Sequence, residues 1–154
     1  MELSKIYNPK NVESKWYEAW EKQKCFTPNL DYNKTFTIMI PPPNVTGILH
    51  MGHVLNNTIQ DVLIRKERMN QKSVLWLPGM DHASIATEAK VTKMLLKKGQ
   101  EKEKIGRAKF LEHAWDWKEE YGGKILNQLK RLGASCDWDK TTFTMDSNYS
   151  QSVI

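Results

Sequence analysis

Residues 35–53 of this chain, TFTIMIPPPNVTGILHMGH, decide the fold. The first six residues of this stretch are β-branched, aromatic or aliphatic, which is typical of a buried strand. Three prolines then end the strand, because proline cannot donate a hydrogen bond to a neighbouring strand, and Asn44 and Gly47 supply turn chemistry. The chain therefore leaves a sheet here and changes direction.

A helix and a second strand follow the prolines. From Gly52 to Met69 apolar residues recur at helical spacing along one side, and these are Leu55, Ile59, Val62, Leu63 and Met69. Residues 73–77, SVLWL, form another short apolar run that Pro78-Gly79 ends. A strand, a helix and a strand predict a βαβ unit with parallel strands. The loops after the two strands should therefore meet at one edge of the sheet, where such folds bind ligands.

Helices are expected on both sides of this unit. Near the N-terminus an apolar face with helical spacing predicts a packed helix, and its members are Val12, Trp16, Ala19 and Trp20. Residues 84–98 read as a helix closed by glycine, and residues 103–132 as a long helix in which Gly122-Gly123 marks a break or a close-packing point. Residues 137–146 read as loop and short extended structure. We expect the paired tryptophans, 16 with 20 and 115 with 117, to pack rather than to stack on bases.

Composition excludes several classes of protein. With 154 residues, 40% hydrophobic content and six Trp, the chain is neither disordered nor collagen-like, and its length suits one domain. The net charge of +5 comes mainly from scattered lysines, a weak indication of nucleic-acid binding. Cys25 and Cys136 specify neither a disulfide framework nor a zinc site. Neither a signal peptide nor a spanning run of roughly 18 apolar residues is visible, so we expect a cytoplasmic protein without a membrane partner.

The loop from Pro43 to His53 holds the residues best suited to chemistry. A helix N-terminus offers free N–H groups, Gly52 permits close approach of a flat base, and His50 and His53 add two donors. The loop is therefore a candidate polyphosphate cradle, and neither a Walker-type loop nor Gly-x-Gly-x-x-Gly is present. Two other readings of the histidines are a satisfied structural pair and a zinc site with His82.

Asp81 follows the second strand at the same predicted edge. A carboxylate there can hold a substrate ammonium group through a charge-assisted hydrogen bond. The competing reading is that Asp81 caps the N-terminus of the helix that begins near Ala83.

These residues resemble the class I aminoacyl-tRNA synthetases, and among them the valyl-tRNA synthetases. His50-Met51-Gly52-His53 matches the His-Ile-Gly-His signature of that class. The flanking runs 41–47, PPPNVTG, and 79–87, GMDHASIAT, are similar to the valyl enzymes rather than to isoleucyl, leucyl or methionyl relatives. The similarity continues through residues 115–118, 132–133 and 143–146. The family pattern has Thr where Met80 stands and Gly where Ser84 stands. We expect Met80 to repack and Ser84 to cap the following helix.

The resemblance implies an α/β fold and a division of the chain. Residues 35–154 would form the first half of a Rossmann-like catalytic domain, truncated before the editing insertion and therefore incomplete. Residues 1–34 would form an N-terminal helical segment. The chain lacks the Lys-Met-Ser-Lys-Ser loop that clamps pyrophosphate in this family. We therefore expect the 154-residue chain on its own to be inactive.

The resemblance also implies a reaction, the activation of L-valine by ATP to valyl-adenylate and transfer to the valine tRNA. His50 and His53 would be the catalytic residues and would contact the triphosphate, with Gly52 against adenine and ribose. Mg²⁺ enters with ATP, no protein-bound metal is predicted, and the full-length enzyme is expected to be a monomer.

The same resemblance assigns the substrate contacts. Asn44 and Thr46 would line the phosphate and substrate loop, and Asn44 also belongs to the valine site. Asp81 and the backbone carbonyl of Pro42 would hold the valine ammonium group. Two other functions stay open: a stand-alone nucleotidyltransferase that uses the His-x-Gly-His loop, and a non-catalytic RNA-binding or partner-binding helical module built on residues 90–130.

Overall fold

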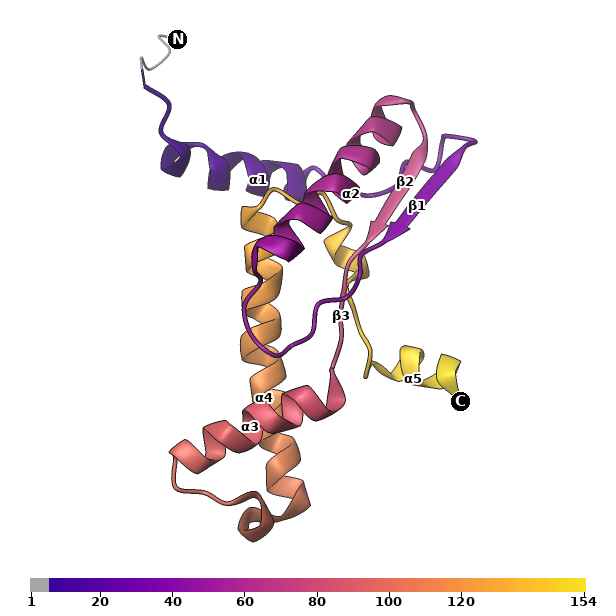
Figure 1. The fold of residues 1–154 in the computed structure, drawn as a ribbon. Helices are drawn as coiled ribbons and strands as arrows, with labels where there is room; N and C mark the ends of the chain where they lie inside the picture. The colour runs from indigo at the N-terminus through magenta and orange to yellow at the C-terminus, as the bar shows by residue number, and fades with distance from the viewer. Residues whose placement is uncertain (1–5) are drawn as a thin grey trace.

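The computed structural model describes residues 6–154 and has an elongated shape in which α4 runs along much of the long axis (Figure 1). The elements in chain order are η1 (Pro9–Asn11), α1 (Glu13–Lys22), β1 (Thr35–Met39), α2 (Met51–Met69), β2 (Ser73–Leu77), β3 (Gly79–Met80), α3 (Ser84–Lys97), α4 (Lys102–Arg131), η2 (Trp138–Lys140), β4 (Thr142–Phe143) and α5 (Ser147–Val153). The predicted helices and strands are confirmed to within a few residues.

The βαβ unit is confirmed by the pairing of β1 and β2, which are parallel with Thr35 opposite Ser73. Strand β2 leads into the short strand β3, which pairs in parallel with β4. The loop after β1 joins the end of β3 through a backbone bridge between Asn44 and Asp81. The two loops that were predicted to meet at one edge of the sheet therefore do meet there.

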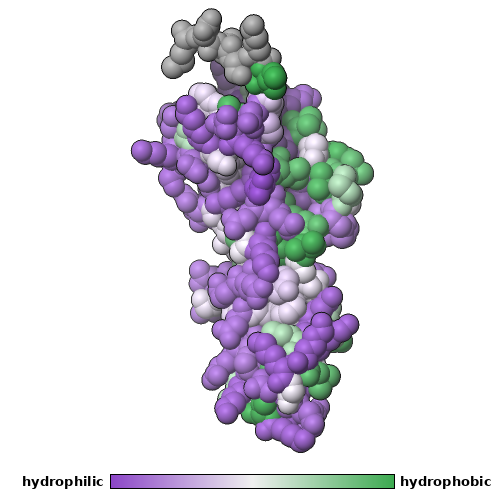
Figure 2. Space-filling model, turned by 90° about the vertical axis from the view of Figure 1, so that its left-hand side faces the viewer, coloured by the Kyte–Doolittle hydropathy of each residue, from purple (hydrophilic) through white to green (hydrophobic). Residues whose placement is uncertain are grey.

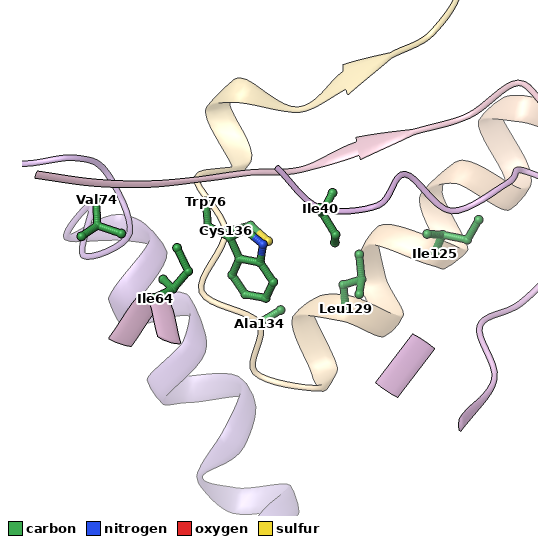
Figure 3. Packing of buried hydrophobic residues seen from close by; sticks show 8 residues of the cluster. All are labelled: Ile40, Ile64, Val74, Trp76, Ile125, Leu129, Ala134 and Cys136. Atoms are coloured by element: carbon green, nitrogen blue, oxygen red, sulfur yellow. The ribbon is translucent and has the colours of Figure 1, made fainter. Parts of the chain in front are cut away.

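The main core lies between the sheet, α2 and the C-terminal half of α4 (Figure 3). Trp76 of β2 is fully buried at its centre, with Ile64 of α2 and Leu129 of α4 in the same cluster. The indole Nε1 of Trp76 donates a hydrogen bond of 3.0 Å to Oε1 of Gln60, so its polar atom is also satisfied.

Helix α4 confirms the long predicted helix, with one correction. Its backbone is interrupted near the start at Gly106, where φ is +76°, and it continues unbroken through Gly122-Gly123. A Cβ added to Gly122 would lie 3.1 Å from Sδ of Met80. Gly122 is therefore a close-packing point, and Met80 is packed against it in a small buried cluster with Phe143.

Two predicted faces are wrong. Helix α1 buries Tyr17, whose hydroxyl donates to the carbonyl oxygen of Ala134 at 2.6 Å, whereas Trp16 is 53% exposed. Strand β1 was expected to be buried, yet Met39 is 65% exposed. Periodicity identifies side chains that share a face, but it does not say which face another layer covers.

The apolar side predicted for α2 also lies at the surface. All its members are exposed, namely Leu55, Ile59, Val62, Leu63 and Met69, and apolar surface is visible on one side of the upper half in Figure 2. The packed side of α2 instead carries Ile64 and Asn57. Across residues 6–154, no helix is both long and apolar enough to cross a membrane.

Candidate functional site

A groove of about 740 Å³ lies where β1 ends and α2 begins, within the size range of ligand pockets. Its lining includes six residues that the sequence singled out, namely Pro42, Asn44, Thr46, His50, Gly52 and His53. Asp81 does not line this groove. It lies beside the groove, because its N–H donates to the carbonyl oxygen of Pro43 and its own carbonyl accepts from the N–H of Val45, both at 3.0 Å.

The two histidines cap the N-terminus of α2. Nδ1 of His50 accepts from the N–H of Gly52 at 3.1 Å, and Nδ1 of His53 accepts from the N–H of His50 at 3.2 Å. A neutral imidazole that accepts at Nδ1 carries its proton on Nε2. Each ring thus keeps one N–H donor beyond the capping contacts, and the ring centroids are 4.1 Å apart.

The surroundings of His53 favour its neutral form. Desolvation by burial lowers the pKa of His53, and the neighbouring His50 lowers it further. A neutral His53 keeps its Nδ1 free to accept the capping hydrogen bond. Gly52 leaves room for the same arrangement, because a Cβ there would lie 3.0 Å from Cε1 of the His50 ring and would crowd it.

The carboxylate of Asp81 does not cap α3. The N-cap residue is Ala83, which makes no side-chain capping bond, and Oδ1 of Asp81 accepts instead from the N–H of Ala83 at 3.0 Å within the preceding turn. The expectation that Ser84 caps α3 is also wrong, since Ser84 is already the first helical residue.

Helix α4 supplies two contacts that the sequence reading missed. Nε1 of Trp117 donates to the carbonyl oxygen of Val45 at 2.7 Å, and Oε1 of Gln128 accepts from the N–H of Leu49 at 2.9 Å. Both hold the loop that carries the groove residues. The only local signal is that Trp117 and Gln128 stand three helical turns apart, which places them on one face of α4.

Lys90 and Thr144 were missed as well. Lys90 of α3 lines the groove, and it takes part in none of the ion pairs found within residues 6–154. It is the one Lys in that lining. Oγ1 of Thr144 lies beside Asp81 and His82, from a segment more than 60 residues further along the chain. No feature of the sequence around Thr144 indicates these partners.

The zinc alternative finds no support in the arrangement of ligands. Within residues 6–154 no group of three or more His, Cys, Asp or Glu side chains is placed to hold a metal ion, and His50, His53 and His82 form no such group.

Comparison with known proteins places the chain in a family. The sequence profile of the tRNA synthetases class I (I, L, M and V) matches residues 15–154. The chain is 60% identical over all its 154 residues to the valine–tRNA ligase of Porphyromonas gingivalis and covers 18% of that protein. It is 59% identical over 153 residues to the valine–tRNA ligase of Fusobacterium nucleatum and covers 17% of it. The chain thus spans less than a fifth of the length of these relatives.

A solved structure shares the fold. The LeuRS of Agrobacterium radiobacter K84, in a ternary complex with tRNA and LeuAMS, superposes with a TM-score of 0.75 at 21% identity over 94% of this chain and 17% of that one. This likeness concerns the fold, which is that of a class I catalytic domain in part. With the profile matching nearly the whole chain, the protein belongs to the class I tRNA synthetases of the I, L, M and V group.

Proposed function

We propose that the full-length protein is a valine–tRNA ligase, which activates L-valine with ATP and transfers the valyl group to the valine tRNA. The observation that carries this proposal is the 60% identity to a valine–tRNA ligase along the whole chain. The groove beside the two histidines that cap α2 supports it. The division into residues 1–34 and 35–154, the cytoplasmic location and the monomeric state belong to the same proposal.

In the activation step the α-carboxylate of valine attacks the α-phosphorus of ATP. A bond forms between a carboxylate oxygen and that phosphorus, the bond to the bridging oxygen breaks, and pyrophosphate leaves with its Mg²⁺. The Nε2–H groups of His50 and His53 donate to phosphate oxygens whose charge grows in the transition state. Preorganised donors of this kind contribute most when they face the developing charge.

The remaining groups position the substrates. The N-terminus of α2 places its positive dipole end at the phosphates, and Gly52 permits the adenosine to approach the backbone. Asn44 and Thr46 line the groove beside the phosphates. Asp81 and the carbonyl oxygen of Pro42 hold the valine ammonium group, in keeping with the backbone bridge that fixes Asp81 to the loop.

Valine-dependent exchange between ATP and pyrophosphate by the full-length enzyme tests the proposal. We expect His53→Ala to lower kcat by about 10²- to 10³-fold, with a much smaller change in the KM for valine, because the contact strengthens in the transition state. His113→Ala is the matched control, because His113 lies on α4 and does not line the groove. Absence of valine-dependent exchange would contradict the function, and an equal loss of valine binding and rate would contradict the role of His53.

A further inference from the structure

We propose that Thr144 is a positioning residue for the amino-acid site, where its single hydroxyl orients the carboxylate of Asp81 and the ring of His82. The inference rests on the proposed function, because it is that function which gives Asp81 the valine ammonium group. It concerns a residue that lies outside the His-x-Gly-His loop and outside the groove lining.

The hydroxyl of Thr144 has three polar partners. Oγ1 lies 3.2 Å from Oδ1 of Asp81, accepts from the N–H of His82 at 2.9 Å, and lies 2.5 Å from Nδ1 of His82. A hydroxyl donates once and accepts twice. All three contacts are satisfied together when Thr144 donates to Asp81 and accepts both the N–H and an Nδ1–H from His82. The proton of a neutral His82 is thereby assigned to Nδ1.

The position of Thr144 is fixed by the sheet rather than by the loop. Its N–H donates to the carbonyl oxygen of Met80 at 3.1 Å, in line with the parallel pairing of β4 with β3. The preceding Phe143 is buried beside Met80 and Val45. The hydroxyl therefore reaches Asp81 from the residue that follows β4 and is itself bonded to β3, which suits an orienting group.

The contacts leave one carboxylate oxygen for the substrate. Oδ1 of Asp81 is occupied by the N–H of Ala83 and the hydroxyl of Thr144, and Nδ1 of His82 lies 3.4 Å from the same oxygen. Within residues 6–154 Oδ2 has no hydrogen-bond partner, and the side chain is 37% exposed. Thr144 thus holds the plane of the carboxylate and leaves the lone pairs of Oδ2 free for an ammonium group.

Steady-state exchange kinetics of the full-length enzyme test this role. Thr144→Val removes the hydroxyl at nearly constant volume, and we expect the KM for valine to rise about tenfold or more while the KM for ATP is unchanged, as for loss of a hydrogen bond to a charged group. Thr144→Ser restores the hydroxyl and should restore the KM for valine. Thr142→Val is the matched control on β4, because its hydroxyl donates to the carbonyl oxygen of Pro78 at 3.5 Å and, within residues 6–154, makes no hydrogen bond to Asp81 or His82.

A double-mutant cycle separates positioning from a general structural effect. If Thr144 acts through Asp81, Thr144→Val adds little to the KM for valine once Asp81→Asn is present. Additive effects, or equal changes in the KM values for valine and ATP, would overturn the role. If Thr144→Val fails to fold, we expect Thr144→Ala to raise the KM for valine in the same way. A wild-type enzyme without valine-dependent exchange would overturn the proposed function as well, whereas an active enzyme insensitive to Thr144→Val would overturn this inference alone.

Discussion

At Ser84 the backbone adopts a φ of +27°, a conformation that suits glycine better than a residue with a side chain. The family resemblance places glycine at this position, so the serine introduces local strain directly after Asp81 and His82. We expect Ser84→Gly to stabilise the protein by about 1 kcal/mol, measured by chemical denaturation.

Ser147→Gly is the control for this prediction. Ser147 is also the first residue of a helix, α5, and it is not among the residues with positive φ. Glycine should therefore destabilise that position, because it only adds freedom to the unfolded chain. Equal effects of the two substitutions would show that Ser84 is unstrained.

The histidine cap predicts a pH dependence of stability. Because burial and His50 lower the pKa of His53 below its ordinary value of 6.5, the unfolded chain binds a proton more readily than the folded one. The stabilising contribution is complete above about pH 6.5 and is lost as the pH falls through the pKa of the folded state. The unfolding midpoint, followed from about pH 8 to about pH 5, should therefore fall more steeply in the wild type than in His53→Gln.

His53→Gln is suited to this comparison because a glutamine at the third helical position also accepts the backbone N–H of a capping box, and it does not titrate. Parallel pH profiles for the two proteins would mean that protonation of His53 does not open the cap.

Helix α4 acts on the substrate loop through two separate hydrogen bonds. Trp117→Phe removes the donor to Val45, and Gln128→Leu removes the acceptor for Leu49. Each change leaves a backbone group of the loop unpaired and should cost about 1–3 kcal/mol of stability. Because the proposed function places both phosphate and valine contacts on this loop, we expect the KM values for ATP and valine to rise together.

Trp115→Phe provides the matched comparison. Trp115 is 46% exposed, packs its ring against Phe143, and, in the part of the chain that the structure describes, makes no hydrogen bond to the loop. If Trp115→Phe lowers stability as much as Trp117→Phe does, the cause is a general weakening of α4 rather than the loss of a hydrogen bond to the loop.

Elements were predictable from the sequence where their signals are local. The strands end at Pro41 and Pro78, and the parallel pairing of β1 with β2 follows from the intervening helix. The histidine loop was also predictable, because its residues are contiguous. Trp117, Gln128 and Thr144 were not, because their partners lie 62 to 79 residues away and no periodic pattern encodes a single long-range hydrogen bond.

At the scale of the whole molecule, the apolar stripe on α2 is the most unusual surface. Leu55, Ile59 and Val62 are each more than half exposed and follow one another along one side of the helix. Large apolar patches promote association in water. We expect the 154-residue chain to self-associate and the double variant Leu55→Lys, Ile59→Lys to weaken association at least about tenfold, because each buried aliphatic side chain contributes about 1.5–3 kcal/mol.

Sedimentation velocity over a concentration series measures this association. Leu96→Lys serves as the control, because Leu96 is 57% exposed but lies on α3, away from the stripe. Unchanged association in the α2 variant, or an equal reduction by Leu96→Lys, would assign the contact to another surface.

The 154-residue chain should also lack activity by itself. It contains no Lys-Met-Ser-Lys-Ser loop, so the pyrophosphate produced in the proposed reaction has no clamp from that segment. We expect no valine-dependent exchange of pyrophosphate into ATP by the purified chain under conditions in which the full-length enzyme turns over. Robust exchange would show that the groove and the histidine pair suffice for activation of valine.

The large sequence separation between Asp81 and Thr144 affects the order in which this site forms during translation. Asp81 leaves the ribosome before its partner Thr144, which is 63 residues further along the chain. At about 5–20 residues per second the interval between them is roughly 3 to 13 seconds. Throughout that interval the nascent chain carries the histidine loop without the strand that orients the neighbouring carboxylate. Assembly of the proposed amino-acid site therefore waits for Thr144, although the histidine loop is synthesised earlier.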